Sequence, residues 1–360
     1  MTQKIFLMIG AVSAGASFDF CTNSNIKMDW LIFWKAFMET KKILVTGGCG
    51  FIGSNFVRMM LQRHSALEIV NLDKLTYAGR EENLKGIESN ERYSFVRGDI
   101  CDAATVEKAM QDCDAVLNFA AETHVDRSIA NADAFLYSNF VGVRVLLEQA
   151  KKQGVQKFVQ VSTDEVYGQI LKGSFNETSV LNPRNPYSAA KAAGELLAMS
   201  YFSTFGLPVV VTRSSNNYGQ FQFPEKVIPL FVTNLLRGKK VPLYGEGKQM
   251  RDWLFVLDNC EAIDAVLQKG KPGEIYNVGG GNEIKNIDLT KMIIKELGKS
   301  EEMIERVPDR LGHDFRYSLD CNKIEKQLGW KPKTDFKKGL KQTIQWYVQN
   351  EWWWSPLVKQ

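Results

Sequence analysis

A tyrosine and a lysine four residues apart are the side chains in this sequence with the clearest potential for chemistry. Tyr187 and Lys191 lie in the stretch NPYSAAKAAGE, inside a helix predicted over 186–205, so both side chains share one helix face. An ammonium group lowers the pKa of a neighbouring phenol, and Tyr187 could then act as a base near neutral pH. Taken alone, such a pair is more often part of a solvated helix surface, so the surrounding elements decide its meaning.

A glycine-rich turn is the second feature with chemical potential. Glycines 47, 48, 50 and 53 in TGGCGFIGSNF lie between a predicted strand, 42–46, and a helix predicted from Phe51 to about residue 64. Glycines there permit a tight turn and let the backbone approach a pyrophosphate, which the helix N-terminus then attracts. Asp73 ends the next predicted strand, and a carboxylate there binds both ribose hydroxyls and repels a 2′-phosphate. The pattern predicts NAD rather than NADP, and a turn that only packs the helix is the alternative.

Apolar segments alternate between strand and helix patterns through the first 219 residues. Strands are predicted at 42–46, 68–73, 93–97, 115–119, 157–162 and 208–212, and helices at 51–64, 103–110, 132–152 and 186–205. Uniformly apolar strands between helices are typical of a parallel sheet covered on both faces. The sequence therefore predicts an α/β fold with a Rossmann-type, doubly wound parallel sheet.

The chain divides into three expected regions. Residues 38–219 are expected to form the NAD-binding domain that carries the catalytic residues. Residues 220–360, with shorter elements and turns such as PLYGEGK and VGGGN, are expected to form mainly a smaller α/β substrate-binding lobe, with more than one crossing between lobes allowed. Residues 1–37 are interpreted as an extension before the true start at Met38, with a weak signal peptide as the alternative. Trp352, Trp353 and Trp354 are expected to pack locally or at an interface.

Composition narrows the class of protein. The chain has 360 residues, is 44% hydrophobic and 24% charged, and carries a formal net charge of +4 without a polybasic run. These values predict a globular protein with no nucleic-acid partner. The apolar run at 5–12 is too short to span a bilayer, so no membrane association is expected. The six cysteines and three histidines are scattered, which disfavours disulfides and metal sites and favours a cytoplasmic location.

Several motifs together resemble one known family. They are TGGCGFIGSNF, NLDKLTYAG, GDI, NFAAETHVDRSI, VSTDEVYG, NPYSAAKAAGE, RSSNNYG, QFPEKVIP, RDWLFV and DRLGHDFRY, spread from residue 41 to about 354. The chain resembles the extended short-chain dehydrogenases/reductases and, among them, the dTDP-glucose 4,6-dehydratases. The resemblance implies tightly bound NAD, a nucleotide-sugar substrate such as dTDP-glucose, and a homodimer formed through the helices near 133–152 and 186–204. One departure is Gln220, where the family often has proline.

The resemblance also implies catalytic roles for Thr163, Asp164 and Glu165, in a loop after the fifth strand. Tyr187 would take the proton of the 4-hydroxyl during oxidation, and Thr163 would orient that hydroxyl. Glu165 would then remove the C5 proton while Asp164, held protonated, donates to the departing C6 hydroxyl. Without this context, two adjacent carboxylates are more often a solvated loop pair. Sugar epimerases of the family usually have small hydroxyl or apolar residues at these two positions.

The remaining candidate residues divide between cofactor and substrate. Cofactor contacts are expected from Gly47, Gly50, Phe51, Ile52, Gly53, Asp73, Asp99, Ile100, Ala120, Ala121, Tyr187 and Lys191. The resemblance implies substrate contacts from Thr123, His124, Asn217, Lys226, Tyr244, Arg251, Asn286, Arg310 and His313. The arginines would bind the diphosphate bidentately, and Tyr244, Asn286 and His313 would lie on the nucleoside side. No metal site is expected.

The function expected from these features is dehydration of dTDP-glucose to the 4-keto-6-deoxy sugar with NAD that stays bound. A UDP-glucose 4,6-dehydratase or an NDP-sugar 4-epimerase on the same fold is the alternative. The sequence leaves open dTDP against UDP, the pathway that uses the product, and the role of residues 1–37.

Overall fold

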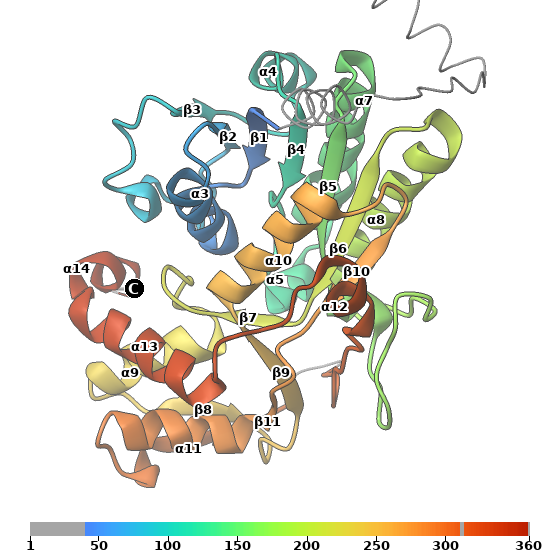
Figure 1. Cartoon of the computed structure of the whole chain (residues 1–360). Helices are drawn as coiled ribbons and strands as arrows, with labels where there is room; N and C mark the ends of the chain where they lie inside the picture. Colours follow the sequence, from blue (N-terminus) through green and yellow to red (C-terminus); the bar gives the residue numbers. More distant parts are fainter. Residues whose placement is uncertain (1–39, 310–312, 359–360) are drawn as a thin grey trace, which may run out of the picture. The chain divides into compact units, whose positions relative to one another are not determined.

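A seven-stranded parallel sheet forms the centre of the protein (Figure 1). The computed structural model describes residues 40–309 and 313–358, so the expectation for residues 1–37 lies outside the described residues. The strands are β1 (Lys42–Thr46), β2 (Glu68–Asp73), β3 (Tyr93–Arg97), β4 (Ala115–Asn118), β5 (Lys157–Thr163), β6 (Val209–Ser214) and β10 (Ile275–Val278). Their order, β10-β6-β5-β4-β1-β2-β3, confirms the predicted doubly wound Rossmann-type fold.

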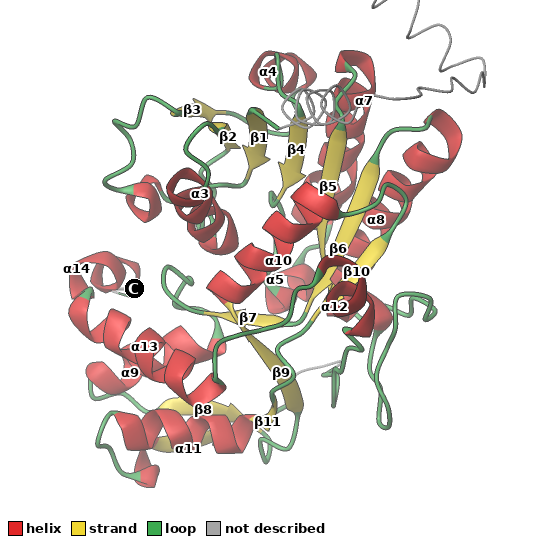
Figure 2. Ribbon diagram, in the orientation of Figure 1, coloured by secondary structure: helices red, strands yellow, loops and turns green. Residues whose placement is uncertain are grey.

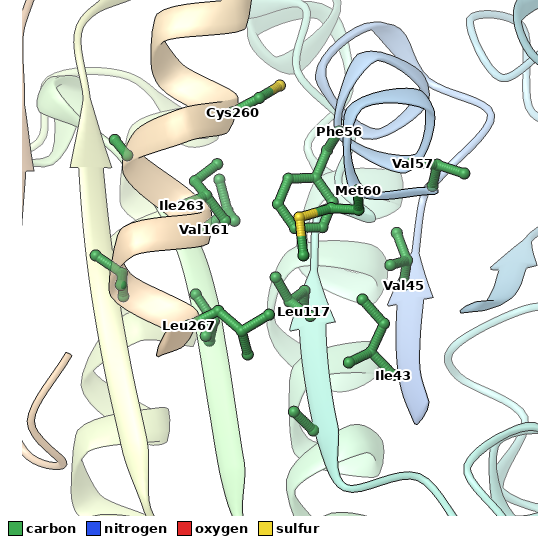
Figure 3. Packing of buried hydrophobic residues seen from close by; sticks show 14 of the residues in the cluster. Ile43, Val45, Phe56, Val57, Met60, Leu117, Val161, Cys260, Ile263 and Leu267 are labelled. Atoms are coloured by element: carbon green, nitrogen blue, oxygen red, sulfur yellow. The ribbon is translucent and has the colours of Figure 1, made fainter. Parts of the chain in front are cut away.

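Helices cover both faces of this sheet (Figure 2). Because successive side chains of a strand point to opposite faces, Ile43 and Val45 of β1 pack on one side and Leu44 on the other. The first face is covered by α3 (Phe51–Arg63), α10 (Val256–Lys269) and α12 (Asn322–Leu328), and Figure 3 shows part of that core. The second face is covered by α4 (Ala103–Ala109), α7 (Val143–Gln153) and α8 (Pro186–Phe205).

The helix predicted over 132–152 is interrupted in the structure. A short helix α5 (Val125–Ala130) comes first, then α6 (Asp133–Leu136), a π-helical segment η2 (Tyr137–Gly142), and α7. Within η2, Asn139 accepts a hydrogen bond from the backbone N–H of Glu122 and donates one to its carbonyl, both at 3.0 Å. These two hydrogen bonds join η2 to the segment that follows β4. π-Helical turns inside helices often occur beside functional sites.

The second half of the chain interleaves a smaller lobe with the large sheet. The lobe contains a three-stranded sheet, β7 (Asn216–Tyr218), β9 (Met250–Phe255) and β11 (Glu283–Lys285), and a pair, β8 (Val241–Tyr244) and β12 (Ile304–Val307). Its helices are α9 (Val227–Leu236), α11 (Asn286–Glu296), α13 (Phe336–Gln349) and α14 (Glu351–Trp354). Between these elements α10 and β10 return to the large sheet, so the chain crosses between the lobes more than once.

The remaining described elements are short 3₁₀ turns, η1 (Glu81–Leu84), η3 (Asp164–Tyr167), η4 (Glu301–Met303) and η5 (Ser355–Leu357). Across residues 40–309 and 313–358, no helix combines the length and the apolar character that a bilayer span requires.

Candidate active site

A cleft of about 620 Å³ lies where the carboxyl ends of the parallel strands meet the smaller lobe. Ligands of open α/β sheets bind at this edge, because the loops that follow the strands converge there. Every residue predicted to contact the cofactor lines the cleft, and so do Thr163, Asp164 and Glu165. The structure thus brings together residues that are up to 144 positions apart in the sequence, from Gly47 to Lys191.

The glycine turn has the shape that a pyrophosphate requires. Gly47 adopts a φ of +71°, and a Cβ on Gly53 would lie 2.3 Å from the Gly47 carbonyl oxygen. Larger residues would therefore break the close packing of the turn against α3. Gly50 caps α3 without a side-chain hydrogen bond, so no side chain competes for the amides of the first helical turn. Phe51 and Ile52, which follow it, line the cleft, so this helix terminus can receive an anion.

The acidic residue at the end of β2 is in place for a ribose. Asp73 is buried and accepts hydrogen bonds from the backbone N–H groups of Cys49 and Leu75, both at 2.8 Å. Burial raises the pKa of Asp73, and these two amides oppose the shift. Each carboxylate oxygen has a second lone pair, so Asp73 retains capacity for ribose hydroxyls. The glycine turn, the open helix terminus and this carboxylate together fit a dinucleotide such as NAD.

The two adjacent carboxylates, Asp164 and Glu165, begin a short helix rather than lying in the predicted loop. Thr163 ends β5 and caps η3, where its hydroxyl accepts from the Glu165 N–H at 3.3 Å. Asp164 is 2% exposed, its Oδ1 lies 3.2 Å from the Thr163 hydroxyl, and its Oδ2 has no hydrogen-bond partner. Burial, then the charges of Glu165 and Asp252, raise the pKa of Asp164 well above its ordinary value. This shift favours the protonated form of Asp164, which is the form that an acid needs.

Glu165 is tied to the helix that carries the tyrosine. Its Oε2 accepts from the Asn185 side-chain amide at 3.4 Å, and Glu165 is more exposed than Asp164. Asn185 is also the N-cap of α8, where its Oδ1 accepts from the Ser188 N–H at 2.8 Å, and Pro186 occupies the first helical position. This cap fixes where α8 begins, and therefore where Tyr187 lies relative to Glu165.

Tyr187 and Lys191 are both buried at the cleft. Lys191 donates to the carbonyl of Val161 at 2.6 Å, and burial lowers its pKa to about 8. Burial, then the charge of Glu165, raise the pKa of Tyr187, while a hydrogen bond with Thr163 opposes the shift. The prediction that Lys191, aided by the charge of the nicotinamide, lowers the phenol pKa concerns the enzyme with its cofactor and stays a prediction. In the protein by itself, desolvation of the phenolate is the largest influence on this pKa.

Three of the residues expected to contact substrate line the cleft. They are Thr123, Asn217 and Lys226, and the Lys226 ammonium donates to the Thr123 carbonyl at 2.8 Å. The Oδ1 of Asn217 is buried without a hydrogen-bond partner. His124 lies beside the cleft and not in its lining: its Nδ1 caps α5 by accepting from the Arg127 N–H at 3.3 Å. Burial lowers the pKa of His124, which favours the neutral ring.

The other expected substrate residues form a second group in the smaller lobe, outside the lining of the cleft. The Tyr244 and His313 rings lie 6.0 Å apart, and Asp309 joins His313 Nδ1 at 2.6 Å and the Gln249 amide at 2.8 Å. The Asn286 N–H donates to the Gln249 carbonyl at 2.9 Å. We call Tyr244, Gln249, Asn286, Asp309 and His313 the lobe cluster.

Two arginines were expected to bind the diphosphate. Arg251 is buried next to the lobe cluster and donates to the carbonyls of Met250 and Asp314, at 2.8 and 2.9 Å. Its charge opposes the rise in the pKa of Asp164, so the guanidinium lies near the catalytic acid. Arg310 lies outside the described residues.

Comparison with known proteins identifies the family. The profile of the GDP-mannose 4,6 dehydratase family matches residues 44–343. A dTDP-glucose 4,6-dehydratase of Streptomyces niveus is 52% identical over 320 residues, which are 88% of this chain and 95% of the relative. A relative of the same name from Escherichia coli is 44% identical, over 88% of this chain and 96% of the relative. The chain is a member of the nucleotide-sugar 4,6-dehydratase family.

A solved structure agrees with this membership. The crystal structure of DesIV, a dTDP-glucose 4,6-dehydratase from Streptomyces venezuelae with NAD bound, is similar with a TM-score of 0.87 and 49% identity. It covers 88% of this chain, which covers 99% of DesIV.

Sequence reasoning missed several residues that line the cleft. They include Lys74, Thr76, Ser138, Phe223 and Glu225. Lys74 pairs with Asp99 at 2.7 Å, and its position directly after Asp73 in NLDKLTYAG could have indicated it. Ser138 could not have been found in this way, because it reaches the cleft through the π-helical segment. Within the described residues, no group of three or more His, Cys, Asp or Glu side chains is placed to hold a metal ion.

Proposed function

We propose that this chain dehydrates dTDP-glucose to dTDP-4-keto-6-deoxyglucose with bound NAD. One observation carries the proposal. Asp164, buried and with its pKa raised well above the ordinary value, stands beside the more exposed Glu165 in the cleft that also holds Tyr187. An acid and a base are needed together to eliminate water, whereas epimerisation and simple alcohol oxidation need no such pair. The names of the relatives support the same reaction.

The first stage is oxidation at C4 of the sugar. NAD⁺ held by the glycine turn and Asp73 would supply the hydride acceptor for this oxidation and the hydride needed later at C6, and its charge would favour the phenolate of Tyr187. Tyr187 takes the proton of the 4-hydroxyl, and the Thr163 hydroxyl orients the sugar oxygen. Lys191 is held in place by its hydrogen bond to the Val161 carbonyl, and its ammonium group contributes a positive charge below a pH of about 8.

The second stage is elimination across C5 and C6. The ketone at C4 acidifies the C5 proton, which Glu165 removes. Asp164 gives its proton to the departing C6 hydroxyl, which leaves as water. When the hydride returns to C6, Glu165 gives the proton that it removed back to C5, and the proton taken up by Tyr187 restores Asp164, so the site ends each turnover in its starting state. The difference between the two roles follows from burial, because Asp164 is enclosed and Glu165 is more open and receives an amide hydrogen bond from Asn185.

The substrate extends, in this proposal, from the cleft into the lobe cluster. Thr123, Asn217 and Lys226 bind the sugar and the adjoining phosphate, and the unpartnered Oδ1 of Asn217 is available as an acceptor. Arg251, and Arg310 outside the described residues, bind the diphosphate. Tyr244, Asn286 and His313 bind the nucleoside, and His124 approaches the sugar from beside the cleft.

The test is turnover without added cofactor. Purified protein is incubated with dTDP-glucose, and the product is examined by mass spectrometry. Loss of one water with a 4-keto product supports the proposal, whereas an unchanged mass with a galacto product indicates an epimerase. UDP-glucose in a parallel reaction decides between the two nucleotides. No turnover of any NDP-hexose would overturn the proposal.

We also propose that the chain is a homodimer. The exposed apolar side chains Leu136, Phe140 and Leu196 lie on the helical layer formed by α6, η2 and α8. A second copy placed there would remove them from water. Leu196→Glu is expected to convert a dimer to a monomer in sedimentation experiments, and a monomeric wild type would contradict the proposal.

A cytoplasmic location is proposed on the state of the cysteines. Cys49, Cys101, Cys113, Cys260 and Cys321 are all free thiols, as expected in a reducing compartment. Fractionation of the producing cell would test it.

A further inference from the structure

One tryptophan near the end of the chain, Trp353, contacts the half of the molecule that carries the glycine turn. It lies in α14, which Figure 1 labels, is 1% exposed and packs within the core of the smaller lobe. Its indole N–H nevertheless donates at 2.7 Å to the Oδ1 of Asn83, which is 270 residues earlier and lies in η1, after β2. Asn83 is fully buried, so both groups depend on this hydrogen bond.

The same Asn83 side chain also forms a hydrogen bond with the glycine turn. Its Nδ2 donates to the carbonyl of Cys49 at 2.8 Å, and the Arg80 N–H donates to the same carbonyl at 2.9 Å. The Cys49 N–H in turn donates to the Asp73 carboxylate at 2.8 Å. Cys49 stands between Gly48 and Gly50, so this residue of the cofactor turn is held on its carbonyl side by η1 and on its amide side by β2.

The indole that starts this chain of contacts is itself fixed in place. Its ring lies 5.1 Å from the Trp346 ring and 5.9 Å from the Phe221 ring, both in edge-on arrangements. The Arg80 guanidinium lies 5.8 Å from its centre. A ring held on several sides cannot redirect its N–H, so the hydrogen bond to Asn83 has one geometry.

We propose that Trp353 and Asn83 form a clasp through which α14 positions the cofactor-binding turn and retains NAD. They are positioning residues, because they act through the Cys49 peptide and do not line the cleft. The inference rests on the proposed function only in taking NAD as the ligand of the turn. It gives a role to part of the tryptophan run that the sequence left unassigned.

The chain offers a matched control for this clasp. Trp354 is 3% exposed and donates its N–H at 2.7 Å, as Trp353 does, but to the carbonyl of Tyr347 within the smaller lobe. Trp353→Phe and Trp354→Phe therefore remove equivalent buried hydrogen bonds, only one of which leads to the glycine turn. Trp352→Phe, at an exposed indole, controls for the substitution itself.

The measurements are the fraction of purified protein that carries NAD, the dissociation constant of NAD for stripped protein, and the melting temperature. Both buried variants should melt earlier than wild type. Trp353→Phe alone should weaken NAD binding, by roughly tenfold, the equivalent of ~1.4 kcal/mol. The Trp354→Phe and Trp352→Phe variants should retain NAD as wild type does.

A second variant, Asn83→Ala, distinguishes loss of the clasp from a general loss of folding. Asn83→Ala should weaken NAD binding at least as much, and Trp353→Phe added to it should weaken binding no further, because both act through one link. Equal NAD affinities for Trp353→Phe and Trp354→Phe, or additive effects with Asn83→Ala, would overturn the clasp. A wild type that binds no NAD would instead count against the proposed function.

Discussion

The cleft and the lobe cluster both contain residues expected from the sequence, yet they differ in how they are built. The cleft collects residues from the ends of adjacent strands, and its catalytic side chains are enclosed and rigidly capped. The lobe cluster collects residues from strand ends, a helix start and the segment around Asp309, and Tyr244 in it is 37% exposed. Under the proposed function, the reaction takes place in the first region, and the second contributes to substrate affinity alone.

The strongest test of this difference between the two regions is to remove the hydroxyl of Tyr187 in the cleft. Tyr187→Phe should lower kcat by about 10³-fold, because Tyr187 is the group proposed to take the proton of the 4-hydroxyl. Bound NAD should stay oxidised when dTDP-glucose is added, as read at the absorbance of NADH. Tyr276→Phe is the control, because Tyr276 does not line the cleft and its hydroxyl donates to the Gln327 side chain. A Tyr187→Phe enzyme with normal turnover would remove Tyr187 from the mechanism.

A smaller loss is expected when only the second stage is disabled. Glu165→Gln should lower kcat by roughly 10²-fold, because the amide cannot accept the C5 proton. Oxidation at C4 should still occur, so reduced NAD should accumulate on the enzyme during the reaction. Wild-type turnover in this variant, or an absence of NADH accumulation, would show that Glu165 is not the base of the elimination step.

A substitution in the lobe cluster should change KM and leave kcat nearly unchanged. Tyr244→Ala should raise KM for dTDP-glucose by about tenfold, the loss of ~1.4 kcal/mol of contact with the base. We expect kcat to remain within about twofold of wild type, since the ring is outside the cleft. Phe205→Ala, also at an exposed ring, should change neither constant. If Tyr244→Ala lowered kcat and left KM unchanged, the separation of the two regions would be wrong.

The smallest effect concerns the stability of the cleft. The pKa of Asp164 is raised by folding, so stability is lost as pH rises from about 4 through the folded pKa. Asp164→Asn removes the ionisation and should melt ~2 °C higher than wild type at pH 8 while losing activity. The difference should shrink as the pH falls toward about 4 and below, where Asp164 becomes protonated in the unfolded state as well. Melting curves across this pH range would contradict the assignment if the difference were independent of pH.

Much of the cleft could be predicted because its residues obey a local rule. Gly47, Asp73 and Thr163 each lie at the end of an apolar strand or directly after one, and parallel strands end at one edge. Ser138 and the lobe cluster follow no such rule. The first depends on a π-helical segment that hydrophobic periodicity does not reveal, and the second on contacts such as Asp309 with Gln249, 60 residues apart.

The sequence by itself determined the succession of strands and helices along the chain and the cofactor turn, because these depend on short-range spacing and residue type; the roles of Asp164 and Glu165 follow only from the family resemblance and stay predictions. Only the tertiary structure decided how these groups are buried and supported. Burial raises the pKa of Asp164 and the pKa of Tyr187 above their ordinary values. The link from Trp353 to the glycine turn also exists only in three dimensions. Desolvation and long-range hydrogen bonds depend on what surrounds a group, and neighbours along the chain do not specify that.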